Sequence, residues 1–395
     1  MERGENDMKK IFLFLLTALA FLSLSACTQV TTTTTYANPN ETYCAGGRVD
    51  GVYLCSRSWI EFYNTTITLT LYVTAADDYD IPTVFTQVET ILRNYHRLFD
   101  KYHTYADMIN IRSVNLANDA VTVVGWELYD ALVFAVAAAD DIQSEGVMLF
   151  NPALGPVLNV WHAARDNPLC LSDAGVDTCP VPTAEMLAGP FNTDLADLIL
   201  DPETHSVAFA KTGMELDLGG FGKGYVAEIV TDLLDQQGIR YLFNGGNSNV
   251  KVGGVNPNND TGFYYIALKT PAVGINADLP YFVYLQVEDD TAVVTSGNYQ
   301  NYFLGAGDGL VYHHIIDPRT YRPGGAAMAV TIILENGALG DVYSTALFLQ
   351  DIEAGVAFVE ATPGLEAVWY LADGTVRTST GFSAYVYEWL IDLPA

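Results

Sequence analysis

Early in the chain the spacing of the apolar residues changes from every second residue to about every 3.6 residues. This change constrains the possible fold more than any other feature of the sequence. The stretch TTITLTLYV at 65–73 alternates polar and apolar residues, as a half-buried strand does. From Val84 to Phe99 apolar residues recur at helical spacing, which predicts an amphipathic helix. Similar changes follow without a regular strand–helix–strand period. The sequence therefore predicts an α+β fold in one large domain.

Further elements follow the same two periods. Helices are predicted at 126–142, 224–238, 341–349 and 352–362. Strands are predicted at 121–124, 264–268, 283–287, 329–334 and 367–370, and residues 198–210 predict two strands around a turn. A stretch with two cysteines and several prolines, 165–183, indicates a surface excursion.

The N-terminus indicates export. Lys9 and Lys10 precede an apolar stretch, 11–22, that is too short to span a bilayer comfortably. The following Leu24-Ser25-Ala26-Cys27 resembles a lipobox. We therefore expect a lipoprotein signal peptide at 1–27 and a lipidated Cys27. This lipid would anchor the protein to the outer face of the cytoplasmic membrane, or on the periplasmic side. An ordinary signal peptide with an incidental cysteine is the alternative.

The remaining cysteines also indicate an oxidising compartment. Residues 28–58 are expected to form a Thr-rich tether with a small cysteine-containing segment, ahead of a domain at 59–395. Besides Cys27 the chain has Cys44, Cys55, Cys170 and Cys179, an even number that favours disulfides. Four cysteines allow three pairings, of which 44–55 with 170–179 would close two short loops.

The charge of the chain limits its partners. The formal net charge is −29, from 47 acidic and 18 basic residues. Such a chain offers no basic patch for a duplex, so we expect no nucleic-acid partner. A phosphate-bearing ligand must then be bound by local groups or through a divalent cation.

Two glycine-rich stretches are candidates for ligand binding. LDLGGFGKGYVAEIV at 216–230 places several glycines and Lys223 between a strand and a helix, where free N–H groups and a point charge suit a phosphate. Its spacing matches neither the dinucleotide-binding nor the P-loop fingerprint, and a structural turn is the alternative. For YLFNGGNSNVKVGG at 241–254 a tight hairpin is a sufficient explanation.

Two neighbouring histidines occur in HHIIDPRT at 313–320, after VVTSGNYQNYF at 293–303, which presents two hydroxyls at a strand end. Strand alternation would put His314 and Ile316 on one face and His313 on the other. We therefore expect only one of the two histidines to face a site. A histidine can act as a general base for a hydroxyl nucleophile, and a merely hydrogen-bonded histidine is the alternative.

A third candidate lies in GDVYSTALFL at 340–349. Asp341, Ser344 and Thr345 are spaced i, i+3 and i+4, which places them on one face of a helical turn. One carboxylate and two hydroxyls form a hard-oxygen cluster that suits Mg²⁺ or Ca²⁺. Alternatively, Asp341 is only an N-cap or first-turn residue.

The order of these motifs is more specific than any one of them. DLGGFGKGY, NGGN, TSGNY, HIIDPRT and GDVYSTAL together resemble the ApbE family, the FAD:protein FMN transferases, which are often bacterial lipoproteins. LFDKYHTYADMINIRSVN at 98–115 and GVMLFNPALGPVLNVWH at 146–162 extend the similarity to about residues 59–385. The resemblance implies an α+β domain of mixed sheets with packed helices, FAD as donor and a divalent metal. It also implies transfer of FMN to a Thr or Ser hydroxyl of an acceptor protein, with release of AMP.

The resemblance further implies roles for individual residues. It makes His314 the catalytic base and Tyr105 the tyrosine that stacks on the flavin, with Tyr102 close by. The implied metal ligands are Asp341, Ser344, Thr345 and a backbone oxygen of Gly220. The other cofactor-binding candidates are Tyr63, Leu149, Phe150, Asn151, Asp217, Lys223, Thr295, Ser296 and Gly297. Asn151 departs from the family, which usually has Asp there.

Two alternative functions remain open from the sequence. A metal-dependent FAD pyrophosphatase would use the same site with water in place of the protein hydroxyl. A non-catalytic flavin-binding lipoprotein would hold flavin without turnover, although His314 and the Asp341 cluster argue against it.

Overall fold

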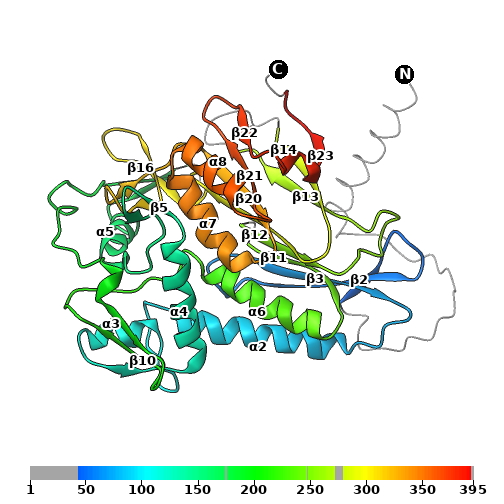
Figure 1. Ribbon diagram of the computed structural model, residues 1–395, viewed down its shortest axis with the longest axis horizontal. Coiled ribbons are helices and arrows are strands. Elements are labelled where there is room, and N and C mark those ends of the chain that lie inside the picture. Colours follow the sequence, from blue (N-terminus) through cyan, green and yellow to red (C-terminus); the bar gives the residue numbers. More distant parts are fainter. Residues whose placement is uncertain (1–42, 174–175, 247, 272–278, 393–395) are drawn as a thin grey trace. The chain divides into compact units, whose positions relative to one another are not determined.

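The computed structural model describes residues 43–173, 176–246, 248–271 and 279–392. An antiparallel nine-stranded sheet joins strands from both ends of this part of the chain (Figure 1). In spatial order its strands are β1 (Cys44–Gly46), β2 (Val52–Trp59), β3 (Ile67–Thr74), β11 (Arg240–Gly245), β12 (Asn249–Gly253), β15 (Thr291–Gly297), β20 (Ala329–Leu334), β21 (Glu366–Tyr370) and β22 (Val376–Thr378). The turn between β11 and β12 and the C-terminal end of β15 lie at the same end of the sheet.

Helices cover one face of this sheet. α6 and α7 pack directly on its central strands, and α2 lies alongside α6 (Figure 1). The helices are α2 (Ile81–Phe99), α3 (Ile111–Ala117), α4 (Trp126–Asp140), α5 (Gly155–Arg165), α6 (Gly222–Gln236), α7 (Gly337–Leu349) and α8 (Ile352–Ala361), with 3₁₀ turns at Leu195–Asp197 and Phe382–Tyr385. The large core between helices and sheet fixes the position of α6 against α7.

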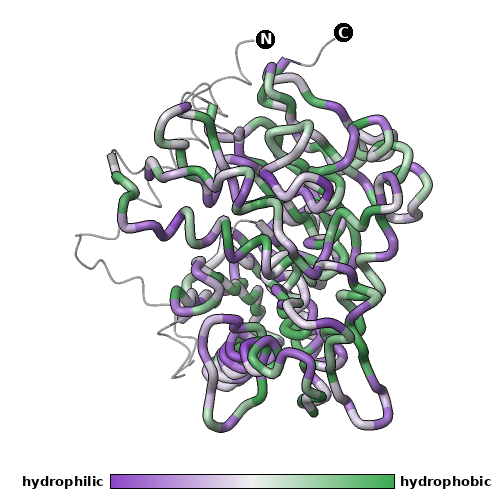
Figure 2. Tube along the Cα trace, turned by 90° about the vertical axis from the view of Figure 1, so that its left-hand side faces the viewer, coloured by the Kyte–Doolittle hydropathy of each residue, from purple (hydrophilic) through white to green (hydrophobic). Residues whose placement is uncertain are grey.

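A second, smaller sheet covers the opposite face. It contains β13 (Tyr264–Lys269), β14 (Tyr281–Val287) and β23 (Val386–Trp389). Alternation along β15 separates the two cores, because Ala292 and Val294 belong to the helix side and Val293 to the side of β13 and β14. The hydropathy of the chain changes over short intervals for the same reason (Figure 2).

Four smaller sheets complete the fold. The first contains β4 (Thr122–Val123), β10 (Ser206–Phe209) and β9 (Leu198–Asp201). The second contains β17 (Val311–His313), β16 (Tyr302–Gly305), β8 (Val176–Cys179) and β7 (Leu171–Asp173). The other two are pairs of strands, β18 (Ile316–Asp317) with β19 (Arg322–Pro323) and β5 (Gln143–Ser144) with β6 (Val147–Met148). The sheet that contains β17 brings the histidine pair next to α5, where Trp161 and Phe303 pack in a separate small hydrophobic core.

The predicted α+β class is confirmed, and most predicted elements are present with shifted ends. The predicted surface excursion at 165–183 contains the β7–β8 hairpin, whose β8 joins a sheet through β16. Helices α3 and α5 were not predicted, because both are short and the motifs around them contain Asn, Gly and Pro. The helix predicted from 341 begins four residues earlier, at Gly337.

Both short-loop disulfides are present, Cys44–Cys55 and Cys170–Cys179. The first joins β1 to β2, and β2 pairs with β3 along eight residues, so this cysteine-containing segment is part of the main sheet.

The predicted signal peptide, Cys27 and the first part of the tether lie outside the described residues. Among the residues that the structure does describe, none of the helices has both the length and the apolar character needed to cross a bilayer.

Candidate active site

Helix α7 contains the predicted carboxylate–hydroxyl cluster. Asn336 caps this helix, because its side chain accepts a hydrogen bond from the Leu339 N–H at 2.9 Å. Asp341 lies one turn further on and is 6% exposed. The alternative that Asp341 is an N-cap is therefore wrong, and its carboxylate is available for another role.

Asp341 receives two hydrogen bonds from neutral donors. The Gly224 N–H, at the start of α6, donates to Oδ2 at 2.7 Å, and Asn249 Nδ2 donates to Oδ1 at 3.2 Å. Burial raises the pKa of Asp341 to about 6, although the charge of Lys223 and both hydrogen bonds oppose the rise. The site thus contains a buried carboxylate whose negative charge is only partly compensated.

Hydroxyl groups surround the next turn of α7. Ser296 Oγ lies 2.9 Å from Ser344 Oγ and 3.3 Å from Thr345 Oγ1, so β15 and α7 meet through three hydroxyls. Ser344 is fully buried. The structure therefore places Ser296, predicted to bind the cofactor, in contact with two of the predicted metal ligands.

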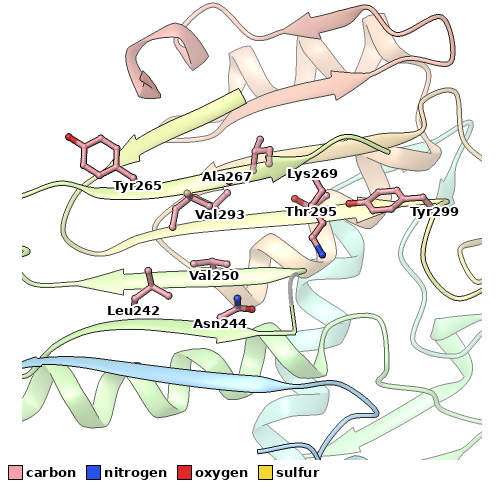
Figure 3. Close-up of a pocket in the computed structure, with 11 residues that line it drawn as sticks. Leu242, Asn244, Val250, Tyr265, Ala267, Lys269, Val293, Thr295 and Tyr299 are labelled. Atoms are coloured by element: carbon pink, nitrogen blue, oxygen red, sulfur yellow. The ribbon is translucent and has the colours of Figure 1, made fainter. Parts of the chain in front are cut away.

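Thr295 lies on the other face of β15. Its hydroxyl is 2.8 Å from Thr331 Oγ1, and its side chain lines a cavity of about 240 Å³ between the main sheet and β13 (Figure 3). Adjacent strand residues point in opposite directions, so Thr295 and Ser296 do not present their hydroxyls to the same site. Gly297 ends β15, where an added Cβ would lie 2.5 Å from the ring of Tyr299.

His314 lies at a bend between β17 and β18. Its side chain is exposed to solvent, yet desolvation by the surrounding protein atoms lowers its pKa to about 3, and the nearby charge of Lys223 acts in the same direction. The charge of Lys223 also acts to lower the pKa of Asp341, so one positive charge influences both the histidine and the carboxylate. At neutral pH His314 is uncharged and able to accept a proton.

The strand alternation expected to put the two histidines on opposite faces does not hold. The strand ends at His313, so alternation does not extend to His314. Both histidines line one hollow, and His313 Nδ1 accepts the Ile315 N–H at 3.3 Å while its ring meets Phe348 edge-on. The other residues that line the hollow are Leu158, Trp161, His162, Arg165, Asn301, Phe303 and Tyr312.

The glycine-rich turn leads into α6. Phe221 occupies the N-cap position without a side-chain hydrogen bond, but in the first turn the Gly222 N–H donates to the Leu218 carbonyl at 2.9 Å and the Gly224 N–H donates to Asp341. Gly220 is exposed, and an added Cβ there would lie 3.0 Å from the ring of Phe150. The exposed Gly219 and Gly220 before the helix leave room for a ligand to approach the backbone closely.

Asp217 is held by an ion pair at the start of this turn. Lys101 Nζ lies 2.6 Å from Oδ2, and the Gly219 N–H donates to Oδ1 at 2.8 Å. Burial alone would raise the pKa of Asp217, but Lys101 and the hydrogen bonds outweigh burial and lower it. Asp217 is therefore an anchored carboxylate that stiffens the turn.

The predicted flavin residues 149–151 lie against this turn with buried side chains. Leu149 and Phe150 are 1% and 5% exposed, so they belong to the core. Asn151 Nδ2 donates to the Thr193 carbonyl at 2.8 Å, and its Oδ1 accepts the Ala153 N–H at 2.8 Å. An aspartate could make only the second bond, which gives the departure at Asn151 a structural reason.

The two predicted tyrosines lie near the C-terminal half of α2. The Tyr63 hydroxyl is buried without a hydrogen-bond partner among the described residues, and its ring lies edge-on to His96. Tyr105 donates to Asp100 at 2.8 Å, with Arg97 over its ring. The hydroxyl of Tyr102 is 3.1 Å from His162 Nδ1, which connects Tyr102, rather than Tyr105, to the hollow beside His314.

Several residues of the site were absent from the predicted set. Asn249 and the Gly224 N–H orient Asp341, Lys101 pairs with Asp217, and His162 lines the hollow with His314. Gly224 was visible as the last glycine of its motif. The partners of Lys101 and Asn249 are about 90 to 120 residues away in the sequence, so no local pattern indicates them.

Comparison with known proteins identifies the family. The sequence model of the ApbE family matches residues 63–369, which is more than half of the chain. The chain belongs to the ApbE family. The matched segment includes the α6 turn, both histidines and the cluster on α7.

Two ApbE relatives carry the name FAD:protein FMN transferase. The protein of Klebsiella pneumoniae (strain 342) is 34% identical over 224 residues, which are 56% of this chain and 62% of that protein. The protein of Treponema pallidum (strain Nichols) is 31% identical over 278 residues, 67% of this chain and 71% of that protein. The chain thus spans less than two thirds of the length of the Klebsiella relative.

The ApbE fold is also evident from solved structures. The crystal structure of the ApbE protein from Thermotoga maritima aligns with a TM-score of 0.69 at 22% identity, covering 85% of this chain and all of that one. At this identity the likeness supports the fold alone.

The donor set of this ApbE chain fits a divalent cation. No group of three or more His, Cys, Asp or Glu side chains suited to a metal occurs among the described residues. A cation at Asp341 would therefore be bound by one carboxylate together with hydroxyl and carbonyl oxygens. Such a site suits Mg²⁺, which prefers oxygen, keeps several waters and often binds together with a substrate phosphate.

Proposed function

We propose that this protein is a metal-dependent FAD:protein FMN transferase. It transfers FMN from FAD to a Thr or Ser hydroxyl of an extracytoplasmic flavoprotein, forms a phosphoester and releases AMP. The observation that carries the proposal is a group of polar side chains near the start of α6. Asp341 is buried there and bonds to the Gly224 N–H, and the hydroxyls of Ser296, Ser344 and Thr345 meet beside it on α7. The charge of Lys223 acts on both Asp341 and the neutral His314. The names of the ApbE relatives support the same activity.

Charge neutralisation is the main requirement of phosphoryl transfer in this site. Asp341, Ser344, Thr345 and the backbone oxygen of Gly220 would hold Mg²⁺ or Ca²⁺. When bound, the cation neutralises the pyrophosphate of FAD, which a chain of net charge −29 would otherwise repel. Lys223 adds a positive charge that acts on both His314 and Asp341.

His314 accepts the proton that the acceptor hydroxyl loses. Its low pKa keeps the imidazole neutral at pH 7, so a lone pair is free for that proton. The hydroxyl oxygen forms a bond to the FMN phosphorus while the bond from that phosphorus to AMP breaks. AMP leaves with the electron pair, and the proton stays on His314 until solvent removes it.

The flavin would be bound by the segments around Asp217. Tyr63, Tyr105, Lys223 and the backbone at Leu149, Phe150 and Asn151 are the candidate contacts, together with Ser296 and Gly297. Thr295 would contribute through its backbone, since its side chain lies on the opposite face of β15.

The protein would act outside the cytoplasm. The lipobox-like sequence ending in Cys27 supports a lipid anchor, and two disulfides support an oxidising compartment. The acceptor would then be a flavoprotein exposed on the same side of the membrane.

The proposal is tested with purified protein, FAD and Mg²⁺. The probe is an FMN-binding domain whose flavin-bearing residue is a threonine, and its Thr→Val variant is the control. The expected result is a flavin-fluorescent band on a denaturing gel for the threonine domain only, with one AMP released per domain, and loss of both signals in EDTA.

Other results would point to the alternatives. Free FMN and AMP without a fluorescent band identify a FAD pyrophosphatase. Stoichiometric bound flavin without AMP release identifies a flavin-binding protein, and either outcome overturns the transferase proposal.

A further inference from the structure

The Cys170–Cys179 disulfide closes a hairpin near the hollow that contains His314. The hairpin consists of β7 and β8, and β8 pairs in parallel with β16, where Cys179 lies opposite Gly305. Strand β16 pairs in turn with β17, which ends at His313. One small sheet therefore runs from the disulfide-bonded hairpin to the histidine pair.

The same disulfide contacts the last turn of α5. Cys170 Sγ lies 3.4 Å from the carbonyl oxygen of Ala164 and 3.3 Å from that of Arg165, and Cys179 Sγ lies 3.6 Å from the latter. Helix α5 supplies His162 and Arg165 to the hollow, opposite the strands. The disulfide thus touches one wall of the hollow and is covalently part of the sheet that forms the other.

An aromatic stack lies between these two walls. The ring of Trp161 on α5 stacks on Tyr312 of β17 at 5.7 Å between centroids, and its Nε1–H donates to the Tyr321 carbonyl at 2.9 Å. Cys179 is fully buried in the same small core as Trp161 and Phe303. Any movement of the hairpin therefore reaches Tyr312, two residues before His314.

We propose that the Cys170–Cys179 disulfide is a positioning element for His314: it holds α5 and the β16–β17 strands at the spacing that proton transfer requires. The inference rests on the proposed function only for the role of His314 as the base. Without the disulfide, position 170, which follows the end of α5 by five residues, and position 179 in β8 are joined only through the β7–β8 hairpin, so the hollow can widen.

Kinetics of full-length variants give the first test, with the threonine-bearing FMN-binding domain as probe. Cys170→Ser/Cys179→Ser is expected to lower kcat about ten- to hundredfold, since displacements of about 1 Å reduce catalysis by this order, with an unchanged KM for FAD. Cys44→Ser/Cys55→Ser, at the edge of the main sheet, is the matched control and is expected to keep the wild-type kcat. Dithiothreitol, which supplies two electrons and two protons per disulfide, should reproduce the loss in wild type and control.

Chemical labelling gives a second test that does not depend on turnover. Carbethoxylation of His162 and His313 by diethyl pyrocarbonate, followed by mass spectrometry, is expected to be several-fold faster in Cys170→Ser/Cys179→Ser and unchanged in the control pair. Unchanged labelling or a wild-type kcat in that variant would overturn the inference, as would equal losses in both variants with equal drops in melting temperature. If the wild-type protein transfers no flavin, the proposed function fails, while the labelling result still decides whether the disulfide positions the histidines.

Discussion

At the scale of single residues, the site depends on two groups whose ionisation the fold has changed. His314 is kept neutral by desolvation and by the charge of Lys223, and Asp341 is buried with two neutral hydrogen-bond donors. A neutral imidazole and an uncompensated carboxylate have complementary uses, because one accepts a proton and the other attracts a cation.

His314→Ala is expected to slow FMN transfer by about 10²–10⁴-fold, the usual contribution of a general base. FAD binding should be unchanged, because the base acts on the acceptor hydroxyl. Transfer rates and flavin-fluorescence titration measure the two quantities. His205→Asn, a change at an exposed histidine stacked on Tyr129, is the control. Full transfer activity in the alanine variant would contradict the assignment.

Asp341→Asn is expected to abolish the effect of Mg²⁺ on thermal stability. In the presence of FAD, Mg²⁺ should raise the melting temperature of the wild type, because a ligand that binds only the folded state stabilises it. The variant lacks the one carboxylate of the cluster and should show no shift, whereas Asp50→Asn, in an exposed turn, should behave as wild type. A retained Mg²⁺ shift in Asp341→Asn would place the cation elsewhere.

Asp217 should make folding stability depend on pH. Its folded-state pKa is lowered, so its stabilisation is present above the ordinary Asp pKa and is lost as the pH falls through the folded value. Asp217→Asn leaves Lys101 buried without its partner and should cost about 3–5 kcal/mol at pH 7. Urea unfolding at several pH values measures this, and the difference from wild type should shrink below pH about 4. Asp107→Asn, which breaks the exposed pair with Arg97, should change little; an equal cost in both would contradict the argument.

At the scale of elements, the close approach of α6 to α7 creates the site. Gly224 permits it, since an added Cβ would lie 2.2 Å from the Gly337 carbonyl oxygen and 2.8 Å from Asn249 Nδ2. The two helices are 117 residues apart at the Gly224–Asp341 hydrogen bond. Their contact is therefore a property of the folded sheet and not of either helix.

Gly224→Ala should push the two helices apart. The expected cost is about 1–3 kcal/mol in the free energy of unfolding, as for other overpacked interiors. The Gly224 N–H bond to Asp341 should weaken as well, which would reduce the Mg²⁺ stabilisation. Denaturant unfolding measures the first effect. Gly46→Ala, whose Cβ would meet nothing within 4 Å, is the control, and an equally stable Gly224→Ala would show that the helices can separate freely.

The sequence predicted the elements that have one buried face, such as the strand at 65–73 and the helix at 84–99, because a single period governs each. It failed where the end of a strand, or a partner residue distant in the sequence, determines the local structure. The strand ends at His313, which alternation could not indicate, and Asn336 starts α7 from a stretch that resembles a turn. Thr295 is different, since alternation itself required it to face away from Ser296.

At the scale of the whole molecule, the net charge of −29 and the oxygen cluster act together. The acidic surface disfavours any polyanion, so the proposed binding of a small dianionic pyrophosphate would depend on a local cation and Lys223. The proposed membrane anchor would keep this acidic domain near its acceptor without attraction to anionic lipid.

The anchor is tested through Cys27. Wild-type cells grown with radiolabelled palmitate should incorporate the label into this protein, because a lipobox cysteine receives acyl chains. Cys27→Ser should remove the label, whereas Cys44→Ser, which only breaks a disulfide, should retain it. Label in the Cys27→Ser protein would reject the lipoprotein proposal.

The separation of Gly224 from Asp341 has a further consequence for biogenesis. A ribosome must make nearly nine tenths of the chain before the last ligand of the cluster exists. Until α7 docks, the Gly224 N–H lacks its Asp341 acceptor, and the proposed cation site is incomplete. Contacts between such distant segments form late and slowly. Under the proposed function, the protein would therefore acquire its cation site only after both helices have been synthesised and packed together.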